Sequence, residues 1–435
     1  MTSLNDTAWD RVFQKLGLLD EIHRDGFARI SATTLKEVGH REPRLMAKQD
    51  TLESRPAIFR RHHLVILPVK NGEYVIFRDS RPQSYYSFDA SVEEIKAERH
   101  DSSIEADRIQ TLSLGSISSE FQAIDYAHLV SVLRTFTSEP DLFLTIRGKY
   151  RSNQFSVNLP GIDEPVEING VQIEIDSGFE GENGIYLIEA KLGRRADFHI
   201  RQLYYPWKDW LTRTDKPIIP IFFTYSNGLF YLTKFRFGEE YGDIEICEHR
   251  CYSVNEDPIL SVDLDELIAS VPPEDAEPGH VPFPQANDLD KIIDIIVSSS
   301  DNPITKESIT DHFEFDERQG DYYANAAIYL DFLSRDRSQP GSFILTDLGK
   351  ELQHCRTRRC RNNLLVRQLF RRPTFRQAII RMRERGFVAE SVEIDEIMDM
   401  INEYDGRCNP VTCRRRASTV RSWLKWLSSN VHFTL

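Results

Sequence analysis

The segments Val171–Asp176 (VQIEID) and Ile185–Lys191 (IYLIEAK) decide the fold in the central part of this chain of 435 residues. Apolar and polar residues alternate in both segments, which is typical of half-buried β-strands. The residues between them, 177–184, include an Asn-Gly pair and have a composition typical of a turn. We therefore predict two antiparallel strands that bring Asp176 and Glu189 together at one end of a sheet, with Glu189 and Lys191 on the same face.

Two carboxylates with a lysine beside them are the groups that metal-assisted phosphodiester hydrolysis requires. Carboxylates bind Mg²⁺, which polarises the phosphate and activates a water molecule, and the lysine orients that water or stabilises developing charge. Glu174 is an alternative to Asp176, because both are expected on the same face of the strand. Asp176 is preferred for its position at the strand end. An isolated acid-x-lysine is more often a solvated strand edge, so the pattern depends on the helix and strand that follow it.

These residues resemble the motif of the PD-(D/E)xK nucleases, a superfamily that includes most type II restriction endonucleases. Asp176 matches the first motif acid, Glu189 the second and Lys191 the lysine, whereas Ile175 stands where proline is usual. The resemblance covers roughly residues 118–240 and implies a mixed sheet flanked by helices, with Mg²⁺ as the cofactor. By the same resemblance, Gln202 on the next helix would lie near the active site. Glu120, on a helix before the hairpin, would be a further acid.

The segments around this hairpin fit the same α/β core. We predict an amphipathic helix over 198–211, with Asp197 as its N-cap and Pro206 inside it. A buried strand over 217–224 and its hairpin partner over 229–237 follow. Upstream, another hairpin is predicted over 64–77, with a loop longer than two residues.

We divide the chain into five parts. Residues 1–117 form an α+β N-terminal region, a candidate for DNA recognition or dimerisation, and residues 118–271 form the nuclease domain. A proline-rich acidic linker at 272–287 is the clearest boundary. Residues 288–353 have the element order of a winged helix, and residues 354–435 form a basic helical domain.

The third helix of the winged-helix region is the candidate for reading bases. In such folds this helix enters the major groove, where arginine suits guanine and glutamine or asparagine suits adenine. The alternative is that its tyrosines pack in the core of the domain. The candidate DNA-binding residues are Arg318, Gln319, Tyr322, Tyr323 and Asn325.

The net charge of −14 conceals a strongly basic C-terminal part. Between His354 and Arg385 there are eleven arginines and one acid, and a further group, Arg414-Arg415-Arg416, follows. Arginine without lysine suits bidentate phosphate recognition, although the same pattern can be a solvated helix face. The candidates for contact with the DNA backbone are Arg371, Arg372, Arg414, Arg415 and Arg416.

The cysteines allow a zinc site, but reduced thiols are expected. The spacing Cys355-x₄-Cys360 and Cys408-x₄-Cys413 could supply four thiolates. However, Cys355 and Cys360 are expected on one helix, where a five-residue step points them in different directions. Cys247 and Cys251 flank a histidine without a second pair. The composition and the absence of a long apolar run favour a cytoplasmic protein without a membrane segment.

Together these features predict a type II-like restriction endonuclease, which cuts double-stranded DNA at a specific sequence with Mg²⁺. A palindromic site would favour a homodimer, and a cognate DNA methyltransferase is expected in the same system without being a physical partner. Two alternatives stay open. One is a methylation-dependent endonuclease, and the other is a DNA-binding regulator with a degenerate nuclease fold.

Overall fold

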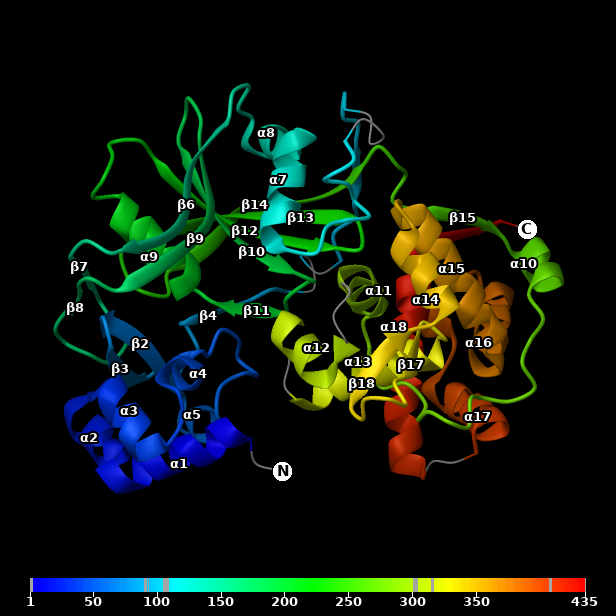
Figure 1. Cartoon of the computed structure of the whole chain (residues 1–435), viewed down its shortest axis with the longest axis horizontal. Coiled ribbons are helices and arrows are strands. Elements are labelled where there is room, and N and C mark those ends of the chain that lie inside the picture. Colours follow the sequence, from blue (N-terminus) through cyan, green and yellow to red (C-terminus); the bar gives the residue numbers. More distant parts are fainter. Residues whose placement is uncertain are drawn as a thin grey trace.

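The computed structural model describes residues 3–89, 92, 94–104, 109–299, 304–313, 317–406 and 409–434. Its centre is a seven-stranded mixed sheet in the order β5-β14-β13-β12-β10-β9-β6 (Figure 1). Strands β9 and β10 form the predicted antiparallel hairpin, and β10 runs parallel to β12. The strands are β5 (Glu98–His100), β14 (Ile244–Val254), β13 (Leu229–Phe237), β12 (Ile218–Ser226), β10 (Ile185–Leu192), β9 (Gln172–Glu180) and β6 (Phe143–Arg151).

Helices cover both faces of this sheet. Side chains alternate along β10, and this alternation determines which of them point to each face. Ile188 and Ala190 enter the core on the face that α7 and α8 cover. Leu187 belongs to the opposite core, where tryptophans of α9 pack. Glu189 and Lys191 have the same parity as Leu187, so they are directed to the α9 face. The helices are α7 (Glu120–Leu129), α8 (Val132–Thr137) and α9 (Arg201–Trp210).

Helix α9 begins later than the sequence predicted, because residues 197–199 form a strand. This strand, β11 (Asp197–His199), pairs with β4 (Tyr85–Ser87). Asp197 is therefore not an N-cap: its Oδ1 accepts a hydrogen bond from the backbone N–H of Leu52 at 2.6 Å. Pro206 lies inside the helix, as predicted.

The first 78 residues build a sheet of their own, in the order β1-β3-β2, with five helices around it. The predicted hairpin is β2–β3, but its loop contains only Asn71 and Gly72, because Lys70 already pairs with Glu73. Gly72 takes a φ of 77°, which glycine adopts without steric cost. The elements are α1 (Leu4–Leu16), α2 (Leu18–Asp25), β1 (Phe27–Ser31), α3 (Ala32–Gly39), α4 (Pro43–Ala47), α5 (Ala57–His62), β2 (Leu64–Lys70) and β3 (Glu73–Arg78).

The predicted region 1–117 thus contributes strands to three sheets in the described part of the chain. Strands β4 and β5 lie before residue 118, yet β4 pairs with β11 and β5 joins the edge of the central sheet at β14. A short hairpin of β7 (Phe155–Val157) and β8 (Val166–Ile168) packs its apolar residues into the same core as β2 and β3. The N-terminal part and the central sheet therefore share buried surface.

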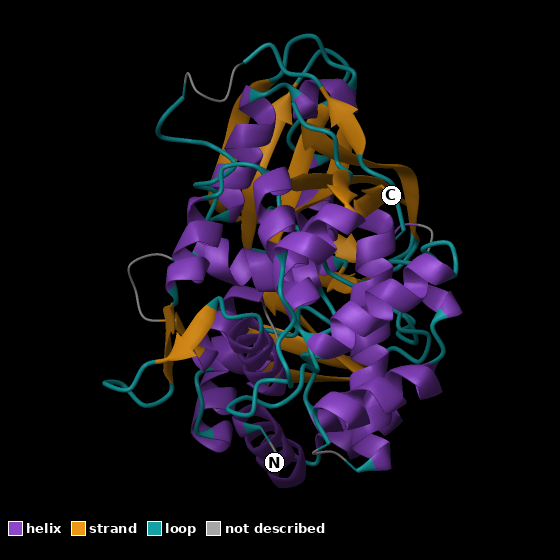
Figure 2. Cartoon of the chain, turned by 90° about the vertical axis from the view of Figure 1, so that its right-hand side faces the viewer, coloured by secondary structure: helices purple, strands orange, loops and turns teal. Residues whose placement is uncertain are grey.

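The C-terminal half is mainly helical and has one continuous core, which runs from Leu260 to Phe433. Figure 2 shows these helices in front of the strands of the central sheet. Strand β19 at the C-terminus runs parallel to β15, which follows the central sheet. The elements are β15 (Leu260–Asp263), α10 (Leu264–Ser270), α11 (Leu289–Ser298), β16 (Ile304–Thr305), α12 (Lys306–Phe313), α13 (Glu317–Tyr329), β17 (Leu333–Arg335), β18 (Ser342–Leu345), α14 (Asp347–His354), α15 (Arg358–Arg371), α16 (Pro373–Glu384), α17 (Ile394–Tyr404), α18 (Pro410–Asn430) and β19 (Val431–Thr434).

The proline-rich segment 272–287 is partly packed into this core, whereas several of its residues stay exposed. Val281 and Phe283 are buried with the helices. The buried carboxylate of Glu277 accepts hydrogen bonds from the backbone N–H of Thr374 at 3.0 Å and from the hydroxyl of Tyr329 at 2.5 Å. At least one acid of this segment therefore binds groups inside the protein rather than solvent.

Among the residues that the structure describes, no helix combines the length and the apolar character needed to cross a membrane.

Candidate active site

Asp176 and Glu189 lie opposite each other where strands β9 and β10 separate. The last pair of the ladder is Ser177 with Ile188, so Asp176 and Glu189 are the next two residues across the gap. Asp176 Oδ2 accepts a hydrogen bond from the backbone N–H of Ala190 at 2.8 Å. The side chain thus bridges the two strands where ladder pairing ends, and the two carboxylates are brought together.

An irregularity in the sheet distinguishes Asp176 from Glu174. The register of β6 against β9 shifts where Ile146 and Gly148 oppose Gly178 and Ile175, which leaves an extra residue on β9 at this point. Such bulges interrupt the alternation of side chains. Glu174 is exposed and lies 3.7 Å from Lys149, whereas Asp176 is 8% exposed. Of the two candidate acids, the preferred Asp176 is therefore the buried one, and Glu174 lies at the surface.

Lys191 and Gln202 both donate hydrogen bonds to one oxygen of Glu189. Lys191 Nζ lies 2.8 Å from Glu189 Oε1, and Gln202 Nε2 lies 2.8 Å from the same oxygen. Gln202 stands in the first turn of α9, which begins after β11, the short strand that follows the lysine-bearing strand β10. The structure therefore brings together the four residues Asp176, Glu189, Lys191 and Gln202.

The electrostatics of the site are those of buried, interacting acids. Burial raises the pKa of Glu189 from 4.5 to about 8; the carboxylates of Asp176 and Glu120 raise it further, and Lys191 opposes them. Burial also raises the pKa of Asp176, against the effect of Lys191. Glu120 begins α7, after the N-cap Ser119. Groups with strongly shifted pKa values cluster at functional sites.

Arg147 is a neighbour of this site that sequence analysis did not find. Its guanidinium donates to Ser177 Oγ at 2.8 Å and forms an ion pair with Asp125 of α7. Ser177 in turn donates to the backbone oxygen of Asp176 at 2.6 Å. The positive charge of Arg147 also acts to lower the pKa of Asp176. No local motif signals this residue, because its position results from the register shift between β6 and β9.

We expect Arg147→Ala to strengthen divalent-cation binding about two- to fivefold, with the larger gain at pH 8 and the smaller at pH 6.5. The guanidinium of Arg147 repels a cation bound at Asp176, and its loss also raises the pKa of Asp176, so competition from protons offsets part of the gain at the lower pH. Calorimetric titration with Mn²⁺ measures this. Arg151→Ala, an exposed arginine on the same strand, is the matched control. Equal affinities of the two variants at both pH values would contradict the expectation.

The residues predicted to read bases have mixed surroundings on α13. Gln319 Nε2 donates to both carboxylate oxygens of Glu53, at 3.0 and 2.9 Å. Asn325 accepts a hydrogen bond from Arg335 at 2.9 Å, and Tyr322 is 37% exposed. Tyr323 is buried in the helical core, so the alternative of a core tyrosine is correct for this residue. The side chain of Arg318 lies outside the described residues.

Most of the five C-terminal arginines predicted to contact the DNA backbone form ion pairs within the protein. Arg372 is fully buried between Glu274 and Asp331, with 2.8 Å to the latter, so its predicted contact with DNA is wrong. Arg416 is mostly buried and lies 2.9 Å from Asp405. The other three candidates reach the surface. Arg371 is 40% exposed beside Glu274. Arg414 and Arg415 are exposed on α18.

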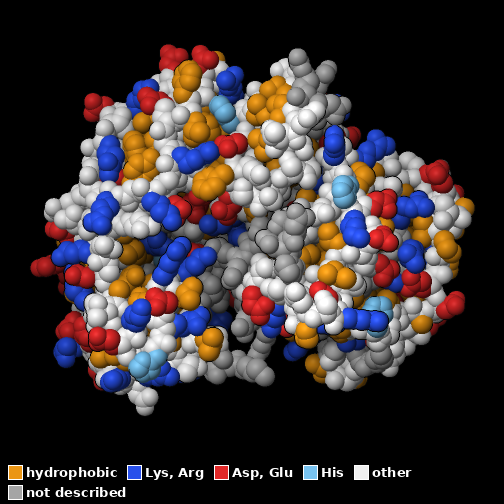
Figure 3. Space-filling model, viewed as in Figure 1, with side chains coloured by type: hydrophobic (Ala, Val, Ile, Leu, Met, Phe, Trp, Pro, Cys, Tyr) orange, Lys and Arg blue, Asp and Glu red, His pale blue; other side chains and the backbone are white. Residues whose placement is uncertain are grey.

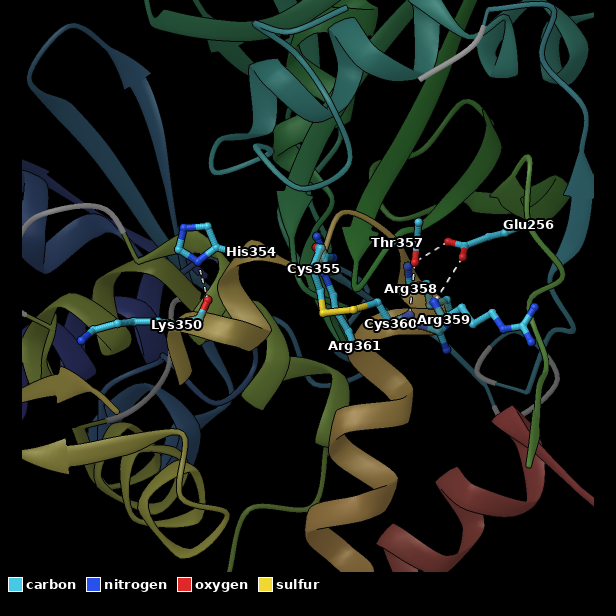
Figure 4. Close-up of a disulfide and its surroundings, with 9 residues drawn as sticks. All are labelled: Glu256, Lys350, His354, Cys355, Thr357, Arg358, Arg359, Cys360 and Arg361. Carbon is cyan, nitrogen blue, oxygen red and sulfur yellow. Dashed lines mark hydrogen bonds between the residues drawn. A yellow bond between two sulfur atoms is a disulfide. The ribbon is translucent and has the colours of Figure 1, made fainter. Parts of the chain in front are cut away.

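Cys355 and Cys360 form a disulfide at the junction of α14 and α15 (Figure 4). Cys355 is the C-cap of α14 and Cys360 lies in the first turn of α15, so the prediction of one helix and of reduced thiols is wrong for this pair. Cys408 lies outside the described residues, and Cys413 is buried without a disulfide. Among the residues that the structure describes, no three histidines, cysteines or acids are grouped to hold a metal ion.

Three domain families match successive parts of the chain, and each is described as a domain of unknown function. DUF6996 matches residues 6–76, DUF6997 matches residues 81–253 and DUF7226 matches residues 291–432. No curated protein and no solved structure matches the chain. The candidate active-site residues all lie within the DUF6997 match. A single family, DUF7226, spans both the winged-helix region and the basic helical region that the sequence suggested.

Proposed function

We propose that this protein is a Mg²⁺-dependent endonuclease that hydrolyses phosphodiester bonds of double-stranded DNA at a specific sequence, as type II restriction enzymes of the PD-(D/E)xK superfamily do. The observation that carries the proposal is the convergence of Lys191 and Gln202 on Glu189, with Asp176 bridged to the same strand. These groups come from a hairpin and the following helix. A chance acid-x-lysine on a strand edge would be solvated, whereas this one is buried.

The acids present suit Mg²⁺. This ion prefers oxygen ligands, and proteins commonly supply one or two carboxylates while water and substrate phosphate complete the coordination. A pair of acids is therefore enough, and Asp176 and Glu189 would hold the ion. When bound, it would polarise the scissile phosphate and make a water molecule more acidic.

The other side chains have roles that follow from their contacts. Lys191 is held beside Glu189 and is suited to orient the attacking water or to stabilise charge on the phosphate. Gln202 fixes the orientation of the Glu189 carboxylate, because its amide donates to the same oxygen. Burial of the group keeps bulk water away, which strengthens each of these interactions.

The C-terminal half supplies features that would hold DNA. The order α11, β16, α12, α13, β17, β18, with a sheet β16-β18-β17, is the order expected of a winged helix and supports this part of the proposal. Figure 3 shows a hollow between the strand-rich half and the helical half, with Lys and Arg side chains along its strand-rich side. To contact a base, Gln319 would have to give up its hydrogen bonds to Glu53. A palindromic target would require two copies of the chain.

The test is incubation of the purified protein with plasmid DNA in Mg²⁺ or in EDTA, followed by sequencing of the fragment ends. We expect double-strand breaks at one sequence in Mg²⁺ alone. Parallel digestion of methylated and unmethylated plasmid distinguishes the methylation-dependent alternative. Absence of nicks and breaks, together with retained DNA binding, would leave the regulator alternative.

Glu189→Gln should stabilise the protein without metal while removing its response to Mg²⁺. The folded-state pKa of Glu189, about 8, lies above the ordinary value of 4.5. Folding therefore favours the protonated form, and stability is lost as pH rises from 4.5 to 8. We expect the variant to melt about 2 °C above wild type at pH 8 and at the same temperature near pH 5.

Thermal unfolding with and without Mg²⁺ measures both effects. Mg²⁺ should raise the melting temperature of wild type most at pH 8, where less proton competition remains, and should leave the variant unchanged. A variant that melts below wild type at pH 8, or that Mg²⁺ stabilises equally, would contradict the assignment.

A further inference from the structure

A cavity of 450 Å³ lies where the N-terminal part of the chain meets the connection between β7 and β8. Its walls come from the end of α2, the end of β3 with the residues after it, and Pro160 and Gly161 (left side of Figure 1). None of the candidate active-site residues lines it. The cavity also falls at the junction of the DUF6996 and DUF6997 matches, which end and begin at residues 76 and 81.

The ionisable groups that line this cavity are three basic residues, His23, Arg78 and Arg81, and one acid, Asp79. Arg78 Nη2 donates to His23 Nε2 at 2.8 Å, which holds the guanidinium and the ring together at the rim. Arg81 is exposed and has no hydrogen bond or ion pair with any residue in the described part of the chain. The hydroxyl of Ser80 and the amide of Gln83 add uncharged donors to the same wall.

The one acid of the lining is directed into the protein. Asp79 is 1% exposed, and its two oxygens accept hydrogen bonds from the backbone N–H groups of Gln83 at 3.0 Å and Ser84 at 2.7 Å. Burial lowers the pKa of nearby His62, and the positive charges of Arg61 and Arg78 lower it further. Two guanidinium groups, those of Arg78 and Arg81, therefore stand against one carboxylate in the lining, and the oxygens of that carboxylate are already occupied by backbone N–H groups.

Close backbone approach gives the cavity its shape. A Cβ atom on Gly26 would lie 3.0 Å from the carbonyl oxygen of Gly161, so a side chain at residue 26 would press these two segments apart by a few tenths of an ångström. Both glycines have a positive φ, 82° and 74°. The concavity is thus fixed by the backbone rather than by mobile side chains.

We propose that this cavity binds a phosphate group, either of a DNA backbone or of a free nucleotide. Guanidinium groups match phosphate oxygens in geometry and can bind two of them at once. The paired Arg78 and His23 provide a fixed donor, and Arg81 provides a second that has no competing partner among the described residues. The volume accommodates more than the phosphate alone, so a sugar or base can enter with it. This inference does not depend on the nuclease activity.

The test uses the full chain in EDTA, titrated by calorimetry with inorganic phosphate, a nucleoside 5′-monophosphate and a short DNA duplex. At least one probe should bind wild type, and Arg78→Ala and Arg81→Ala should each weaken that binding roughly tenfold. Arg134→Ala, an exposed arginine on α8, should bind as wild type does. All three arginines are exposed, so the melting temperatures of the three variants should match.

Which of the three probes bind, and which variants weaken that binding, identifies the source of the phosphate. Duplex binding that both cavity variants weaken, without response to the small probes, assigns the DNA backbone. Binding of phosphate or mononucleotide that both variants weaken assigns a free ligand. Absence of saturable binding by every probe, or equal affinities for wild type and both cavity variants, overturns the proposal.

Discussion

Lys191→Ala should lower the rate of DNA cleavage by about a thousandfold or more while DNA binding stays within twofold of wild type. The lysine contacts Glu189 directly, so its loss removes a charge at the proposed reacting centre and leaves the residues proposed to bind DNA unchanged. Cleavage of the target duplex under single-turnover conditions measures the rate. Fluorescence anisotropy in Ca²⁺ measures binding.

Lys149→Ala is the matched control, because Lys149 lies on the neighbouring edge strand β6 and is 53% exposed. It should cleave at the wild-type rate. Removal of Lys191 also leaves two buried acids without their cation, and Lys191→Gln preserves a hydrogen-bond donor to Glu189 if the alanine variant folds poorly. Wild-type cleavage by either folded variant would remove Lys191 from the mechanism.

The hairpin that carries the site could be predicted because its evidence is local. Alternation along 171–176 and 185–191, with a turn composition between, determines the strands, their antiparallel pairing and the face shared by Glu189 and Lys191. Gln202 followed from the resemblance, and the structure places its amide on Glu189. Each of these features depends on residues close together in the chain.

The remaining features depend on contacts that distant parts of the chain make. The basic composition of 354–385 predicted a DNA-binding surface, yet Arg358, Arg361 and Arg372 are fully buried. Arg361 donates to backbone oxygens of Cys355 and Leu114. In the sequence, an arginine that pairs with a carboxylate or donates to a carbonyl inside the protein looks the same as an arginine that binds phosphate. Burial alone distinguishes them, and burial is a property of the tertiary fold.

The contact between the central sheet and the helical half is another feature of this kind. The turn between β12 and β13 inserts Asn227 into the helices. Its backbone N–H donates to Asp294 at 2.7 Å, and its amide donates to Asp290 at 2.7 Å and to Asn362 at 2.9 Å. Arg358 donates to its carbonyl oxygen at 2.8 Å. Asn227 is fully buried and has a φ of 43°, a conformation that asparagine tolerates better than most residues.

Asn227→Ala should destabilise the protein by about 3 kcal/mol, because it leaves buried acceptors on Asp290 and Asn362 without this donor and places alanine at a positive φ. We expect the melting temperature to fall by roughly 6 °C. Asn227→Gly is the matched variant, because it loses the same amide but relieves the backbone. It should recover about 1 kcal/mol of the loss. Thermal unfolding of both variants at pH 7 measures the difference.

Asn227→Asp separates the electrostatic part of this contact from the hydrogen bonds. It keeps the shape of the side chain but adds a third acid beside Asp290 and Asp294, and burial already raises the pKa of Asp294 to about 7. The variant should therefore be less stable than Asn227→Ala at pH 8. It should regain stability as pH falls through 7 and the buried acids become protonated. A melting temperature of Asn227→Asp that does not respond to pH between 8 and 6, or one equal to wild type, would show that the turn does not hold the sheet to the helices.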